Sequence, residues 1–247
     1  MQVKGYPIRP GASLVKAALY RAVLRNADLR RADLRQANLD EAILKWADLS
    51  QARLQEASLR AADLRSAALV EADLRQATLV EALLLRANLQ RANLTQASLQ
   101  WADLQSANLQ QADLSGADLG RASLRRSNLN AVSLRAADLF GAELAEAEME
   151  GADVAQAKLR SADLIWTRLQ FANLRGADLR SARLTRANLT GADLRDADLR
   201  GAYMRGTNLN EVNLIGADLR GAIVSAGQLD WARRLDGVKL PDGRLFA

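Results

Sequence analysis

The sequence predicts an all-β solenoid, and three features of the chain support this fold class. Position 14 and every fifth position after it up to 224 hold leucine or a close apolar substitute, 43 positions in one register. The residue two places before each of these is small and nearly always alanine, and no insertion interrupts the register. A fixed short period of this kind is the signature of a repeat solenoid. The four positions in the register that are not leucine are Met149, Val154, Met204 and Val224.

The five-residue period excludes the helix that the composition favours. Alanine, leucine, arginine, glutamine and glutamate are good helix formers. A helix turns about 100° per residue, so leucines five residues apart would scatter around it and form no apolar stripe. In a strand, side chains alternate, so alanine at i−2 and leucine at i point inward while the residue at i−1 points outward. The repeat therefore reads A-(D/N)-L-x-x, as in Ala27-Asp28-Leu29-Arg30-Arg31, with a corner at i+1 and i+2.

This in–out assignment predicts which substitutions disrupt the fold. The inward leucines and alanines form a packed column with no space for a ligand. Leu104→Asp would bury an unpaired carboxylate in that column and disrupt folding. Asp103 points outward, so Asp103→Ala is predicted to cost less than about 0.5 kcal/mol.

The A-(D/N)-L-x-x run over residues 12–226 closely resembles the pentapeptide-repeat family. This resemblance implies a right-handed quadrilateral β-helix with four pentapeptides, or about 20 residues, per coil. The repeats would then make about 11 coils, stacked at a strand spacing of about 4.8 Å into a rod roughly 50 Å long. Asn88, Asn108 and Asn128 would lie one coil apart and form a side-chain ladder.

We expect one elongated domain with a cover at each end, because open terminal coils would pair with other molecules. Residues 1–11 form an irregular N-terminal cap, residues 12–226 the β-helix, and residues 227–247 a short α-helix-containing cap. In that cap a helix is predicted from Gln228 to Leu235, with its stop at Gly237. Apolar surface for covering the last coil comes from Leu229, Trp231, Ala232 and Leu235.

The tail also resembles that of cyanobacterial pentapeptide-repeat proteins, of the form L-x-x-A-x-x-L-x-G-x-x-L-P-D-G. This second resemblance implies a soluble protein of unknown biochemical role. The residues that match the form are Leu229, Ala232, Leu235, Gly237, Leu240, Pro241, Asp242 and Gly243.

Glycine is distributed unevenly among the corners. None occurs between residues 12 and 115, whereas from Gly116 onward it recurs at i+2. Glycine at a corner permits a positive φ. The sequence leaves open whether the corners of the two halves have the same conformation.

The composition predicts a protein without enzymatic activity, metal or cofactor. The chain has no cysteine and no histidine, which removes thiolate ligands, disulfides and the commonest general base. Its carboxylates lie on flat walls with no cleft to shift their pKa values. No apolar run is long enough to span a bilayer, and the N-terminus has no signal-peptide core, so the predicted location is cytoplasmic and no membrane contact is expected.

Two surface features are candidate sites. Outward apolar residues gather on the wall that contains Leu24, Leu44 and Leu64, and contiguous apolar surface usually marks an interface. The alternative is that charged rows separate these residues and they are merely tolerated. The candidate partner contacts are Ile43, Trp46, Leu83, Leu85, Ile165, Trp166 and Tyr203.

The second candidate is an anion-binding stripe along another wall. The alternative is that these arginines belong to a lattice of exposed ion pairs, in which arginine at i+1 pairs with aspartate at i−1, as in Asp178 and Arg180. The stripe residues are Arg160, Arg180, Arg200 and Arg220.

We therefore predict a non-enzymatic structural or interaction module that presents side-chain ladders to a protein partner or to a second copy of itself. One alternative is a DNA-mimicking protein that protects or inhibits topoisomerases, as the resemblance to the quinolone-resistance branch of the family implies. Such mimicry needs an excess of carboxylates, whereas this chain has 34 Lys and Arg against 29 Asp and Glu. The other alternative is binding of anions or nucleic acid through the arginine rows, although nucleic acid is not the expected partner.

Overall fold

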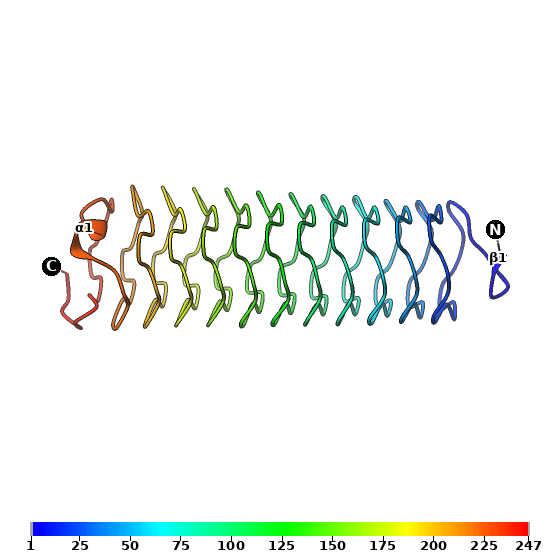
Figure 1. The fold of residues 1–247 in the computed structure, drawn as a ribbon, viewed down its shortest axis with the longest axis horizontal. Helices are drawn as coiled ribbons and strands as arrows, with labels where there is room; N and C mark the ends of the chain where they lie inside the picture. Colours follow the sequence, from blue (N-terminus) through cyan, green and yellow to red (C-terminus); the bar gives the residue numbers. More distant parts are fainter. Residues whose placement is uncertain (1, 247) are drawn as a thin grey trace.

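Successive coils of the chain stack along one axis, from the N-terminal hairpin to the C-terminal tail (Figure 1). This computed structural model describes residues 2–246. Parallel bridges join residues at i−1 that are twenty positions apart, and they form four ladders that begin at Ser13, Ala18, Val23 and Asp28. Each coil therefore has four sides. We call them walls 1 to 4 in that order, and each wall includes the corner that follows it in the chain.

Each wall is only a few residues wide, yet its backbone is regularly paired with the neighbouring coils. The N–H of Leu14 donates to the carbonyl oxygen of Asp33 at 2.7 Å, and the N–H of Asp33 donates back to Ala12 at 2.9 Å. The N–H of Lys16 donates to Arg35 at 2.9 Å. Three of the five N–H groups of a typical repeat are thus bonded between coils, which fixes the register of the rod.

All the corners of the repeat region share one conformation. The N–H of Ala17 closes a turn onto the carbonyl oxygen of Leu14 at 3.0 Å, and the residue before it, Lys16, has a φ of 56°. Every i+2 residue from 16 to 221, glycine or not, has a φ between 51° and 71°. A positive φ at the second central position is the feature of a type II turn. The glycine-free half and the glycine-containing half therefore have the same corner.

Aspartate and asparagine at i−1 hold this corner through a hydrogen bond that the sequence analysis did not foresee. The N–H at i+1 has no backbone partner in the neighbouring coils, and where aspartate or asparagine stands at i−1 its side-chain oxygen usually accepts from it. Examples are Asp48 Oδ1 with the N–H of Ser50 at 2.9 Å and Asp103 Oδ1 with the N–H of Gln105 at 3.1 Å. This local bond gives a physical reason for the D/N preference in the repeat.

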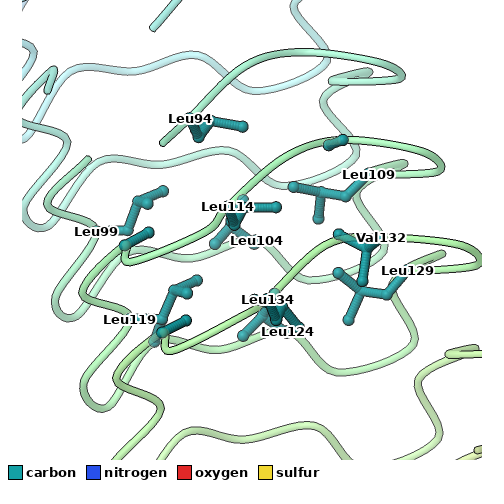
Figure 2. Close-up of a cluster of buried hydrophobic side chains, with 14 of the residues drawn as sticks. Leu94, Leu99, Leu104, Leu109, Leu114, Leu119, Leu124, Leu129, Val132 and Leu134 are labelled. Atoms are coloured by element: carbon teal, nitrogen blue, oxygen red, sulfur yellow. The ribbon is translucent and has the colours of Figure 1, made fainter. Parts of the chain in front are cut away.

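The leucines and the small residues at i−2 fill the inside of the rod (Figure 2). Leu104, in the middle of the rod, has no exposed surface. On wall 4 the small position is polar in three coils, and each hydroxyl is satisfied by a leucine carbonyl oxygen. Thr167 donates to Leu144 at 2.9 Å and Thr207 to Leu184 at 2.8 Å, while Ser127 donates within its own turn. The column is therefore closely packed.

The N-terminal segment is more regular than predicted. Strands β1 (Gln2–Val3) and β2 (Tyr6–Pro7) pair antiparallel as a short hairpin. The hairpin covers the open end of wall 2, because Tyr6 Oη accepts from the N–H of Ala18 at 3.1 Å and Lys4 Nζ donates to the carbonyl oxygen of Tyr20. Ile8 is buried against the first coil.

The predicted helix from Gln228 to Leu235 is wrong in its bounds. Helix α1 spans Ala226–Leu229, a single turn, and the chain then returns to the coil path. Asn213 pairs with Arg234, and Asp218 with Lys239, so walls 1 and 2 each gain one more layer with a shift of one residue. The segment Val238-Lys239-Leu240 repeats the inward–outward–leucine pattern, with Val238 buried, and this favours the pairing of Lys239 over a longer helix.

Walls 3 and 4 end differently, under α1. The Gln228 side chain donates from Nε2 to the carbonyl oxygen of Met204 at 2.7 Å and to that of Thr207 at 2.9 Å. The carbonyl oxygen of Thr207 is the one that a further coil would otherwise bond, as Asn208 bonds that of Ala187. Leu229 is buried, as the cap requires, but Trp231 is 69% exposed and does not cover the last coil.

Candidate functional site

The walls, not a pocket, are the chemically distinctive surface of this rod. Within residues 2–246 no group of three or more metal-ligating side chains gathers at one place. In the same part of the chain, no helix has the length and apolar character needed to cross a bilayer. The candidate sites are therefore rows of side chains on the four walls.

The apolar candidates all lie on wall 3, where they form patches. Ile43 pairs with Val23 at the N-terminal end, and Tyr203 pairs with Ile223 at the C-terminal end. Trp46 and Trp166, at corners of this wall, are 52% and 53% exposed. Ile43, Leu85 and Ile165 are half-buried, whereas Leu83 and Tyr203 are exposed.

Charged side chains separate these patches. Arg65 donates to Asp63 from Nε at 2.7 Å and from Nη2 at 2.6 Å, between the first two apolar patches. Arg183 pairs with Asp163 at 3.3 Å near Trp166. Wall 3 is thus an alternation of apolar and ionic surface rather than a continuous apolar stripe.

Cations lie over the exposed tryptophans. Lys45 Nζ is 4.5 Å from the ring centroid of Trp46, and the Arg186 guanidinium is 4.9 Å from that of Trp166 in the coil below. Cation–π contacts of this kind contribute about 0.5–1 kcal/mol at exposed sites. These contacts place a positive charge beside a large apolar surface at two separate patches of wall 3.

The predicted arginine stripe lies on wall 2, and three of its four arginines are paired. Arg180, Arg200 and Arg220 each donate through Nε and Nη2 to the aspartate two residues before them, at 2.5–3.1 Å. The hydrogen bond from Arg180 lowers the pKa of Asp178 below its usual value. Arg160 forms no ion pair in the described part of the chain. The geometry favours the ion-pair lattice over an anion-binding stripe of unpaired arginines.

Another set of cations, which the sequence alone did not single out, lies on wall 3 and has no carboxylate partner within residues 2–246. A twenty-residue period places these cations on wall 3, but it does not separate them from the paired Arg65, Arg126 and Arg183 of the same wall. The unpaired set, which we call the wall-3 cations, comprises Arg25, Lys45, Arg86, Arg125, Arg186 and Arg205.

The predicted ladder of asparagines is present in part. Asn108 Nδ2 donates to Asn88 Oδ1 at 3.2 Å, one coil away. A longer polar ladder runs along a corner of wall 4, where Gln51 accepts from Arg31 at 2.8 Å and donates to Glu71 at 2.9 Å. These ladders hold exposed side chains in fixed positions along the rod.

Comparison with known proteins identifies the repeat. A family model described as pentapeptide repeats (8 copies) matches residues 11–40, 42–80, 82–121, 117–156, 157–196 and 187–225. No curated protein matches the chain.

Several solved structures are similar. HetL, a pentapeptide repeat protein involved in heterocyst differentiation regulation from the cyanobacterium Nostoc sp. strain PCC 7120, is 36% identical, over 89% of this chain and 91% of that protein, with a TM-score of 0.47. Rfr23 from the cyanobacterium Cyanothece 51142 is 31% identical over 39% of this chain and 63% of its own, with a TM-score of 0.34. QnrB1, a plasmid-mediated fluoroquinolone resistance protein, is 18% identical over 77% of this chain and 89% of its own, with a TM-score of 0.38.

Proposed function

Because this chain belongs to the pentapeptide-repeat family, we propose that it is a non-enzymatic interaction module, a rigid rod that presents fixed rows of side chains to a protein partner. In this proposal the rod is a right-handed quadrilateral β-helix of about 11 coils, with residues 1–11 and 227–247 covering the ends of the repeat region 12–226. The regular backbone pairing between coils supports the rigidity.

The observation that carries the proposal is the exposure of large apolar side chains at the corners and outward positions of wall 3. Most corners of the chain hold Arg, Gln, Glu, Ser or Gly, whereas Trp46 and Trp166 are about half exposed beside Ile43 and Ile165. Burial of tryptophan and leucine at an interface contributes about 2 kcal/mol or more per side chain. The proposed contacts are Ile43, Trp46, Leu83, Leu85, Ile165, Trp166 and Tyr203.

The test replaces both Leu85 and Trp166 by glutamine, which the repeat already accepts at i+1 and i+2 and which adds no charge to wall 3. The matched control is Phe171→Gln, an exposed corner aromatic on wall 4. We expect unchanged circular dichroism for both proteins, and weaker self-association in sedimentation or weaker capture of the native partner for the wall-3 variant alone. Equal behaviour of the two proteins in both assays would refute the assignment of wall 3.

Charge argues against the topoisomerase alternative. Wall 4 is the one wall with more carboxylates than cations, and its excess is two. A DNA mimic needs a dense negative surface, so we expect the protein to leave gyrase supercoiling unchanged. A regulatory role, as the name of HetL describes for that protein, falls within the interaction module proposed here, and a cytoplasmic location is part of the same proposal.

A further inference from the structure

The excess positive charge of the repeat region is concentrated on one wall. Wall 3 carries nine Lys and Arg against five Asp and Glu, whereas walls 1 and 2 are balanced and wall 4 has an excess of acid. The same wall holds the apolar patches described above. Charge and apolar surface therefore coincide on wall 3.

The pairing of side chains makes this asymmetry sharper. Of the nine Lys and Arg on wall 3, Arg65, Arg126 and Arg183 are paired, and the other six, the wall-3 cations defined above, lack an ion pair with a carboxylate in residues 2–246. Wall 2 has three such cations, Arg60, Arg121 and Arg160, while walls 1 and 4 have one each, Lys16 and Arg31. The positive charge of wall 3 is thus available to a partner instead of being neutralised by neighbouring aspartates.

The wall-3 cations span most of the rod and alternate with the apolar patches. Arg25 and Arg205 lie nine coils apart, about 43 Å at a strand spacing of about 4.8 Å. Lys45 and Arg186 lie against Trp46 and Trp166, so each of these patches offers a cation and an apolar face together. A partner that complements this wall needs carboxylates and apolar side chains at intervals along an extended surface.

We propose that wall 3 binds an acidic protein segment, whose carboxylates contact the wall-3 cations while its apolar side chains cover the patches. This proposal rests on the interaction function above and names the chemistry of the partner. Nucleic acid fits less well, because Asp103 and Glu143 on the same wall have no cationic partner and would face phosphates. The apolar patches would also gain nothing from a uniform phosphate backbone.

The test compares two double variants that remove equal charge from the same position of the repeat, i+1. Arg125→Gln with Arg205→Gln removes two wall-3 cations, and Arg60→Gln with Arg160→Gln removes two unpaired cations from wall 2. Glutamine already occupies i+1 at Gln55 and Gln105, so folding is expected to persist. Circular dichroism checks this.

Three fluorescent probes are titrated at low salt: a peptide of about 20 residues made of Glu, Asp and Leu, a peptide of equal length made of Lys, Arg and Leu, and a DNA duplex of similar length. We expect the acidic peptide to bind most tightly, the wall-3 variant to weaken it at least fivefold, and the wall-2 variant to change it less than twofold. Added salt is expected to weaken binding.

The proposal is overturned if the unmodified protein does not bind the acidic peptide, or if it binds the DNA or the basic peptide as tightly as the acidic one. It is also overturned if the two variants lose the same amount of affinity for the acidic peptide. Loss of partner capture by the Leu85 and Trp166 variant alongside any of these results would leave the interaction function standing and refute only the acidic chemistry. Retention of partner capture by that variant would refute the interaction site itself.

Discussion

Replacing Asp103 by alanine tests whether the carboxylate at i−1 stabilises the corner. Its Oδ1 accepts from the N–H of Gln105 at 3.1 Å, and this is its one hydrogen bond in the described structure. A net hydrogen bond to a charged acceptor contributes about 1.5–3 kcal/mol, and partial exposure of Asp103 reduces this to about 1 kcal/mol. As an ordinary surface residue, Asp103 was predicted to contribute less than about 0.5 kcal/mol to the free energy of unfolding.

The assay is thermal unfolding followed by circular dichroism at neutral pH. For a chain of this size, 1 kcal/mol corresponds to about 2–4 °C in Tm, so we expect Asp103→Ala to lower Tm by that amount. The control is Asp103→Asn, which retains an oxygen acceptor and should stay close to the unmodified protein. An unchanged Tm for the alanine variant, or an equal loss for both variants, would refute the corner bond as a source of stability.

Four other substitutions test the core, the corners and the ion pairs. Leu104 is fully buried, so Leu104→Ala should destabilise the rod by about 3–5 kcal/mol in the same thermal assay, and a loss as small as that of Asp103→Ala would contradict the packed column. Gly191 and Gly201 have φ values of 68° and 66°, but a Cβ on Gly191 would lie 2.7 Å from the Phe171 ring, whereas one on Gly201 would lie 3.6 Å from Ser181 Oγ. Gly201→Ala should cost about 1 kcal/mol for the left-handed backbone and Gly191→Ala more, and equal losses would exclude the clash. Arg180 lowers the pKa of Asp178 from its usual 3.8, so this pair stabilises the fold above pH 3.8 and loses that contribution as the pH falls through the lowered value. The Tm difference between the unmodified protein and Arg180→Gln should therefore shrink in acid, and a difference independent of pH would show that the pair contributes nothing through its charge.

The five-residue period of the sequence predicts most of the fold. Because Leu104 and its equivalents recur at a five-residue spacing that no helix can use, their inward position follows from the pattern alone. The corner conformation does not follow, since Arg, Trp and Ser at i+2 are unfavourable at positive φ and adopt it because pairing on both sides of the corner requires it. The local sequence therefore hides a feature that the stacked coils impose.

The C-terminal helix was predicted too long for a related reason. Gln228 to Leu235 has helical composition, but Arg234 and Lys239 continue the ladders of walls 1 and 2, and that pairing replaces the second turn of the helix. Trp231 is consequently carried to the outside instead of covering the last coil. Tertiary pairing decided what the local pattern left ambiguous.

The sequence predicts on which wall each candidate residue lies, but it does not predict which cations are paired with a carboxylate. A twenty-residue period places Trp166 and Leu85 on one wall and Arg180 and Arg200 on another. It does not show that Arg180 turns back onto Asp178 while Arg125 and Arg205 have no ion pair. That distinction depends on side-chain conformation, and it shifts the candidate cations from wall 2 to wall 3.

Site-specific photo-crosslinking in the native host tests the central claim most directly, because it reports which wall contacts a partner in the intact protein. A photoreactive amino acid replaces Trp166 on wall 3 or, as the matched control, Phe171 on wall 4, both exposed corner aromatics. We predict a crosslinked partner from position 166 and none from position 171, with the linked peptide rich in Asp and Glu. Crosslinks from position 171 alone, equal crosslinks from both positions, or none from position 166 would contradict the assignment of wall 3 as the binding surface.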